Sequence, residues 1–188
     1  MFLVLYFISA SLYPGGSNAF PEKDGFDWIY SYWCNLTEDY SINGKVNLAK
    51  PYALGGAIVL CVSLSYFFFM FPRYFELKYP WNKIMIFAGV LACVFTLLIH
   101  TKFHDLMAIL ASAFGSFAII ALFLGLRKRG WLHFIWTGSV CIVLVVLNGY
   151  IYFSGNYIKL LPLIQKITFA AVLLWFLALN VMLRTHRK

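Results

Sequence analysis

Long, uninterrupted runs of apolar side chains are the feature that most constrains the fold of this chain. A helix needs roughly 20 such residues to cross the ~30 Å hydrocarbon core of a bilayer. Inside lipid every backbone polar group needs an internal partner, so only helices and closed β-barrels span a membrane. The apolar residues are continuous here rather than alternating, which favours helices over a barrel. The sequence therefore predicts an all-α, polytopic membrane helix bundle.

The composition agrees with this class. Hydrophobic residues make up 62% of the 188 residues and charged residues only 12%, whereas a soluble domain is about half apolar and a quarter charged. A chain of this length is expected to form one domain. We therefore predict a single integral membrane domain over residues 1–188.

Six apolar runs predict six transmembrane helices. The predicted spans are Met1–Tyr13, Tyr52–Phe71 (ended by Pro72), Ile84–His100, Asp105–Leu126, Trp131–Phe153 and Leu163–Leu183. The first run would rise only about 20 Å, so we expect a short or tilted helix, or a locally thinned bilayer. A further segment upstream of this sequence is the alternative.

The basic residues predict the orientation of these spans. One set of span ends holds nine basic residues and one acid, Glu76; the nine are Arg73, Lys78, Lys83, Arg127, Lys128, Arg129, Arg184, Arg187 and Lys188. The other set holds six basic and six acidic residues. The positive-inside rule makes the basic set cytoplasmic, with both termini, and leaves the loop at residues 14–51 on the outer face. The short basic clusters beside spans suit lipid headgroups and argue against a nucleic-acid partner.

The outer loop carries a pattern of its own. In the segment FDWIYSYWCNLTEDY, apolar and aromatic residues recur at spacings of three and four, which predicts an amphipathic helix over Phe26–Asp39. Asp24 would cap this helix. Trp28 and Trp33 have the amphipathic rings that partition to the headgroup level. The helix could simply lie over the outer surface as a lid, or it could form one wall of a site.

Three short motifs resemble a known family. The chain reads Tyr13-Pro14-Gly15-Gly16, then Trp28 with Cys34-Asn35-Leu36, and then His104-Asp105. These residues resemble an uncharacterised six-span membrane family with YPGG and His-Asp motifs, which often has Asp where this chain has Asn35. The layout also resembles the Frag/DRAM/Sfk group of six-span proteins. That resemblance implies lipid handling and lipid-anchor remodelling.

The turn between the third and fourth spans holds the candidate catalytic residues. His100 and His104 are four residues apart and would share a face of a helix, and Asp105 follows directly. Two histidines and a carboxylate could bind zinc with an open position for water, with Asp27, Glu38 or Asp39 as further ligands. The alternative is structural: Asp105 caps the fourth span, His104 lies at the membrane interface, and His100 ends the third span with a hydrogen bond.

Residues of the outer loop and of the outer ends of the spans are the candidate ligand-binding residues. They are Asp27, Trp28, Trp33, Asn35, Glu38, Asn148 and Lys166. Lys166 is the most informative, because an ionisable group inside a span usually faces a partner or water. Its stem could instead extend to the outer headgroups. We predict that His104, Asp105 and at least one of Asp27, Glu38 or Lys166 lie within one side chain's reach.

Function is less constrained than fold. The sequence has no nucleophile elbow, phosphate loop, dinucleotide fingerprint or Cys-x-x-Cys motif. The first hypothesis is a membrane protein that handles a lipid or another amphiphile, with membrane lipids as partners, and that could be a lipid-modifying enzyme. The second is a non-catalytic binding or assembly protein that holds a lipid or a protein partner in an aromatic outer groove. The third is a small transporter.

Overall fold

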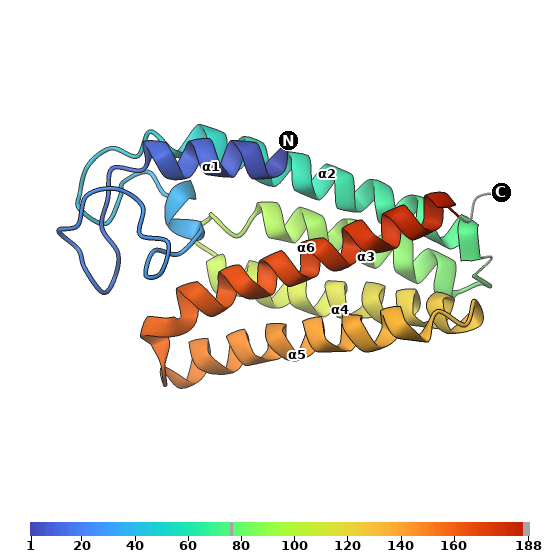
Figure 1. The fold of residues 1–188 in the computed structure, drawn as a ribbon. Coiled ribbons are helices and arrows are strands. Elements are labelled where there is room, and N and C mark those ends of the chain that lie inside the picture. Colours follow the sequence, from blue (N-terminus) through green and yellow to red (C-terminus); the bar gives the residue numbers. More distant parts are fainter. Residues whose placement is uncertain (76, 186–188) are drawn as a thin grey trace. The chain divides into compact units, whose positions relative to one another are not determined.

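The computed structural model describes residues 1–75 and 77–185 and is all-α over them. This part of the chain forms six α-helices joined by loops and two short 3₁₀ turns, and Figure 1 labels the helices α1 to α6. The helices are α1 (Phe2–Leu12), α2 (Lys50–Phe75), α3 (Trp81–Leu97), α4 (His104–Lys128), α5 (Leu132–Ser154) and α6 (Leu161–Thr185). The 3₁₀ turns are η1 (Cys34–Thr37) and η2 (Ile158–Leu160). Each helix overlaps one predicted span, so the prediction of an all-α helical protein is confirmed.

Helix length separates the six helices into two groups. Within the described residues, four segments are long and apolar enough to cross a membrane: Lys50–Phe75, His104–Lys128, Leu132–Ser154 and Ile158–Thr185. Helix α1 has 11 residues and α3 has 17, which corresponds to about 16 and 25 Å of rise. Both are apolar but shorter than the ~30 Å hydrocarbon core. The helices thus show four candidate spans where the sequence predicts six.

Helix α2 does not end at Pro72, so that predicted boundary is wrong. The helix continues to Phe75 with Pro72 inside its last turn. Proline removes one hydrogen-bond donor from a helix, but the end of α2 has other partners. The Phe71 and Phe75 rings stack with centroids 4.2 Å apart, and Lys128 donates a hydrogen bond to the Phe75 carbonyl.

The chain forms two compact units. The first consists of residues Met1–Gly56 and Gly138–Phe176, and the second of Ala57–Thr137 with α6 from Leu177 onward. Helices α2, α5 and α6 therefore contribute to both.

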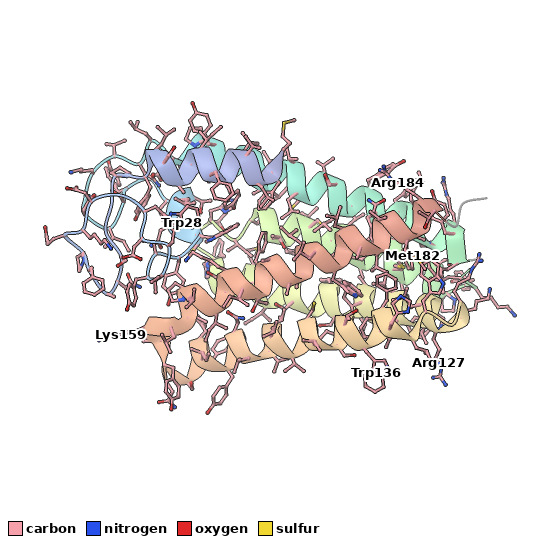
Figure 2. The ribbon with its side chains drawn as sticks, viewed as in Figure 1. Trp28, Arg127, Trp136, Lys159, Met182 and Arg184 are labelled. Carbon is pink, nitrogen blue, oxygen red and sulfur yellow. The ribbon has the colours of Figure 1, made fainter. Side chains whose placement is uncertain are left out.

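The second unit is packed through small residues and rings. Helices α3 and α4 lie side by side, and they run antiparallel because only the turn at residues 98–103 joins them. Gly89 of α3 faces the Phe68 ring of α2, where a Cβ would lie 2.3 Å from Cγ. Arg127 and Arg184 lie at the same end of this unit (Figure 2), which is also the end where Arg129 donates to the Tyr74 carbonyl at 2.6 Å. Basic residues at the ends of α4 and α6 thus share one end.

The first unit contains α1, the start of α2, and most of α5 and α6. Within it, α1 contacts the start of α2. Buried Ser9 of α1 donates a hydrogen bond to the Ala49 carbonyl at 2.9 Å. Gly56 of α2 lies against Tyr6, where a Cβ would come within 2.8 Å of the ring. The residues between α1 and α2, numbers 13–49, form a folded segment that we call the α1–α2 loop.

The YPGG motif has a structural role in the α1–α2 loop. The buried Tyr13 hydroxyl donates to the Gly16 carbonyl at 3.3 Å and accepts from the Ile42 amide at 3.2 Å. Burial raises the pKa of this tyrosine. Gly16 has φ +87°, and a Cβ there would lie 2.7 Å from the Asn43 nitrogen. The backbone at Gly16 therefore passes so close to the backbone at Asn43 that this position needs glycine.

The predicted amphipathic helix over Phe26–Asp39 is wrong. Regular structure in this segment is limited to the 3₁₀ turn η1. Asp27, rather than Asp24, begins a single turn, since its Oδ1 accepts from the amides of Ile29 and Tyr30. The segment then becomes irregular because its aromatic rings pack on other elements, as Trp33 does on Tyr6. Such tertiary contacts outweigh the local helical pattern.

Candidate functional site

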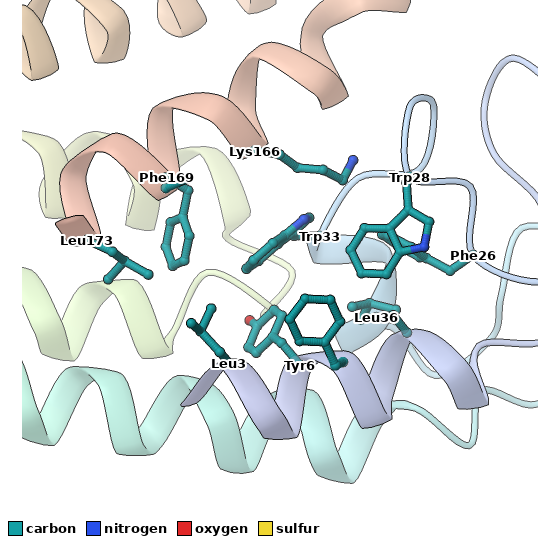
Figure 3. Close-up of a pocket in the computed structure, with 12 residues that line it drawn as sticks. Leu3, Tyr6, Phe26, Trp28, Trp33, Leu36, Lys166, Phe169 and Leu173 are labelled. Carbon is teal, nitrogen blue, oxygen red and sulfur yellow. The ribbon is translucent and has the colours of Figure 1, made fainter. Parts of the chain in front are cut away.

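An apolar pocket lies within the first unit, between α1, the α1–α2 loop and α6 (Figure 3). Its volume is about 270 Å³. The lining side chains are almost entirely aliphatic or aromatic, and one cation, Lys166, belongs to them. They are Leu3, Tyr6, Phe7, Ala10, Phe26, Trp28, Trp33, Leu36, Lys166, Phe169, Ala170 and Leu173.

Aromatic rings from three parts of the chain build the pocket wall. The Trp33 ring stacks on Tyr6 at a centroid distance of 4.7 Å and contacts Phe169 at 4.9 Å. Trp28, which is 48% exposed, contacts the Phe7 ring at 5.5 Å. Such ring pairs stabilise a defined geometry beyond the area that they bury. The wall thus links the α1–α2 loop to both helices.

Lys166 brings a charge to this apolar wall. It lies in the second turn of α6, and its side chain is half-buried. Its ammonium donates hydrogen bonds to the carbonyls of Ser31 and Pro162 and lies 5.4 Å from the centre of the Phe26 ring. The lysine therefore ties α6 to the α1–α2 loop.

Two buried nitrogen atoms of the loop have no hydrogen-bond partner among the residues that the structure describes. They are Nε1 of Trp33 and Nδ2 of Asn35. An unpaired buried donor costs free energy comparable to a lost hydrogen bond. In Figure 3 the nitrogen-bearing edge of the Trp33 ring faces the Lys166 side chain. Asn35 does not line the pocket.

Asp27 serves the fold of the loop. Its carboxylate accepts from Lys23 at 2.7 Å and from the amides of Ile29 and Tyr30. Burial opposes its ionisation, but the Lys23 contact and the two amides outweigh burial and lower the pKa of this carboxyl. The carboxylate of Asp27 is therefore satisfied within the loop.

Cys34 and Glu38 do not line the pocket. Burial, followed by the nearby charge of Glu38, raises the pKa of the Cys34 thiol to about 11. The thiol is protonated at neutral pH and is a poor nucleophile. The side chain of Glu38 is exposed, and its backbone carbonyl accepts from the Asn47 amide at 2.9 Å.

The predicted catalytic residues belong to the second unit. His104 Nδ1 and Asp105 Oδ1 are 3.0 Å apart, and both side chains are exposed. Helix α4 begins at His104, so His100 lies in the preceding turn and does not share a helical face with His104. Asp105 is in the first turn of α4, where an acid suits the helix dipole, but the N-cap is Phe103.

A zinc site at this turn would need a third ligand. Over residues 1–75 and 77–185, no three His, Cys, Asp or Glu side chains are grouped so that they could hold a metal ion. Zinc at His100, His104 and Asp105 stays a prediction.

Asn148 has a packing partner. Its Nδ2 donates to the Leu144 carbonyl within α5 and to the Thr168 hydroxyl of α6 at 2.6 Å. Interhelical hydrogen bonds of this kind hold membrane helices together. Asn148 therefore joins α5 to α6 and is absent from the pocket lining.

The structure brings three of the predicted ligand-binding residues to one pocket, namely Trp28, Trp33 and Lys166. Asp27, Asn35, Glu38 and Asn148 do not line it. His104 and Asp105 belong to the second unit and Lys166 to the first, so their predicted clustering stays a prediction. Sequence reasoning missed the apolar and aromatic lining that α1 and α6 supply, such as Tyr6 and Phe169. Their only signal is an aromatic residue in an apolar run, which also fits lipid contact.

Searches of protein-family models, of curated proteins and of solved structures each found no match to this chain.

Proposed function

We propose that this chain is an integral membrane protein that binds an amphiphile in the pocket of its first unit. The observation that carries the proposal is a pocket of about 270 Å³ with an almost wholly apolar lining and a half-buried ammonium, that of Lys166. An apolar cavity has too few polar partners to hold water. A molecule with an apolar chain and a polar head is complementary to both parts of the pocket.

The surroundings of the pocket support a membrane ligand. Leu3 and Phe7 of α1 line the pocket and are also 52% and 59% exposed, and α6 belongs to a segment long and apolar enough to span a bilayer. Exposed apolar side chains around a pocket suit a ligand that arrives from lipid. The Frag/DRAM/Sfk resemblance, itself a prediction, points to the same class of function.

Photolabelling tests the proposal. A long-chain amphiphile with a diazirine on its chain is added to the purified protein in nanodiscs, and the labelled peptides are identified by mass spectrometry. We expect labelling of α1 and of α6 near Phe169. Ala170→Phe adds a ring at an exposed lining position and should reduce this labelling several-fold. Val146→Phe, an equally large ring on the exposed face of α5, is the matched control. Equal labelling of both variants and wild type would refute the proposal.

We further propose six membrane crossings, with the α1–α2 loop outside and both termini in the cytoplasm. The basic end of the second unit supports this orientation. Helix α3 runs antiparallel to its neighbour α4, which is long enough to cross a membrane, and a locally thinned bilayer would let the shorter α3 cross beside it. In intact cells an impermeant thiol reagent should label Lys45→Cys but not Lys128→Cys. Cys34 would add little background, because its pKa is about 11. The reverse labelling pattern would contradict the topology.

A catalytic role is the second candidate, and the His104–Asp105 contact of 3.0 Å favours it. A carboxylate that accepts from Nδ1 fixes the tautomer of the ring and leaves Nε2 as the basic nitrogen. Such a pair could act as a general base in a lipid-modifying reaction. To test this role, lipids are incubated with the wild-type protein or with His104→Ala, and the masses of the lipids are then compared by mass spectrometry. Product formed by wild type alone would support an enzyme, and unchanged lipids would favour a binding protein.

A further inference from the structure

We infer that the ligand of this pocket is a single-chain amphiphile with a carboxylate head, a fatty-acid-type anion whose head lies at Lys166 and Trp33. This inference rests on the proposed function and adds the chemical class of the ligand. It follows from the polar atoms that the lining provides, from the charge that they leave unpaired, and from the size of the pocket.

The side chains around the pocket carry polar atoms that can all donate hydrogen bonds, although these atoms contribute almost none of the pocket surface, which is apolar. They are Lys166 Nζ, the indole nitrogens of Trp28 and Trp33, and the Tyr6 hydroxyl. An ammonium and an indole N–H only donate, and a tyrosine hydroxyl can donate or accept. Among the described residues, none with a carboxylate or a side-chain amide lines the pocket. A ligand head that only accepts is therefore the best match.

The charge on Lys166 lacks a carboxylate partner within residues 1–75 and 77–185. The two carbonyls of Ser31 and Pro162 accept two of its three N–H groups. The charge of Asp27 acts on it, but that carboxylate is hydrogen-bonded to Lys23 and to backbone amides. A half-buried cation beside apolar rings is costly without an anion. An anionic head would supply the missing charge.

Trp33 supplies a second donor on the same side of the pocket. Its Nε1 is buried and has no partner in the described part of the chain, and its nitrogen-bearing edge faces Lys166 in Figure 3. A carboxylate has two oxygens, and each can accept from one of these donors. Charge-assisted hydrogen bonds of this type are about twice as strong as neutral ones.

The apolar part of the pocket favours one chain. Lys166 and Leu173 are two helical turns apart on α6, which is roughly 10 Å along the axis. Leu3, Phe169 and Leu173 line the end away from Trp28 and Phe26 (Figure 3). A volume of about 270 Å³ lies just below the ~300–1,000 Å³ of pockets for drug-sized ligands. One acyl chain fits such a space better than a two-chain phospholipid.

Four probes with the same twelve-carbon chain test the inference. Dodecanoate, dodecanol, dodecylammonium and dodecyl phosphate are added separately at pH 7 to the 188-residue chain in phosphatidylcholine nanodiscs. Bound probe is counted by native mass spectrometry, with empty nanodiscs as the background. We expect wild type to bind dodecanoate about tenfold more tightly than dodecanol and to bind dodecylammonium least.

Variants of the head site give the second readout. Lys166→Met keeps the length of the side chain and removes its charge, so it should lose the tenfold preference while dodecanol still binds. Lys166→Arg should retain the preference. Trp33→Phe keeps the ring and removes the N–H, so it should weaken dodecanoate binding several-fold.

The possible outcomes separate the inference from the proposed function. If wild type and Lys166→Met bind dodecanoate and dodecanol equally, the carboxylate head is refuted and amphiphile binding stands. Tighter binding of dodecyl phosphate than of dodecanoate would also overturn the inference. If Ala170→Phe binds every probe as wild type does, the pocket is not the binding site and both proposals fail.

Discussion

The α1–α2 loop and the helices of the second unit are stabilised in different ways. In the loop, polar side chains hydrogen-bond to the backbone; buried Asn47, for example, donates to the carbonyls of Asn35, Leu36 and Glu38. In the second unit, contact comes from rings that pack on small residues, as Phe68 does on Gly89. The stability of the loop therefore depends on hydrogen bonds made by individual polar atoms, and the stability of the helix packing depends on the complementary shapes of rings and small residues. The two regions should therefore respond to different substitutions.

The largest effect is expected where the loop backbone crosses itself. Gly16→Ala places a Cβ 2.7 Å from the Asn43 nitrogen and forces alanine to φ +87°. Left-handed strain and overpacking together should cost about 3 kcal/mol. The measurement is thermal unfolding in detergent. Gly25→Ala is the matched control, because it has φ +74° and open space around it. An equal loss in both variants would show that strain alone matters at Gly16.

Asn47→Ala tests the polar half of the comparison. It removes the donor to three carbonyls and the acceptor of the Ala49 amide, which should cost about 2 kcal/mol. Asn18→Ala, an exposed asparagine in the same loop, should be neutral in the same unfolding assay. A neutral result for Asn47→Ala would mean that the loop does not rely on side chain to backbone hydrogen bonds.

Gly89→Ala tests the packed half. Its Cβ would lie 2.3 Å from Cγ of Phe68, which is buried, so overpacking should cost about 1.5 kcal/mol. Gly149→Ala in α5 meets open space and should stabilise the protein by about 0.5 kcal/mol through helix propensity. The difference between the melting temperatures of Gly89→Ala and Gly149→Ala measures the cost of overpacking against Phe68. Two equal melting temperatures would be inconsistent with shape-dependent packing.

The smallest effect concerns Asp27 and depends on pH. Its lowered pKa means that the ionised form stabilises the fold. This stabilisation is present at neutral pH and is lost as the pH falls below about 4. Asp27→Asn keeps an acceptor for the amides and loses the Lys23 ion pair, at a cost of about 0.5–1 kcal/mol. The gap between wild-type and variant melting temperatures should narrow from pH 7 to pH 3.5, and a constant gap would contradict this assignment.

The helices were predictable from sequence because lipid-compatible segments must be long and continuously apolar. The predicted ends mostly lie within a few residues of the observed ones, but the end of α2 does not, because Phe75 and Lys128 extend it past Pro72. The α1–α2 loop was not predictable. Its aromatic spacing matches a helix, yet Trp28 and Trp33 pack on rings distant in sequence.

Of the residues that line the candidate pocket, only Lys166 and the two tryptophans were predictable from the sequence. A lysine inside an apolar run is conspicuous, so the sequence identifies Lys166, and the tryptophans of an outer loop are similarly distinctive. Leu3, Tyr6 and Phe169 are apolar or aromatic residues among many others. Only the folded chain brings them together around one cavity.

An experimental map of the protein in native-lipid nanodiscs, obtained with a bound antibody fragment, tests the central claim most directly. We predict elongated density between α1 and α6, running from Leu3 and Leu173 to a head within hydrogen-bond distance of Lys166 Nζ and Trp33 Nε1. A well-resolved pocket that is filled by the protein's own side chains, or by water alone, would contradict the account.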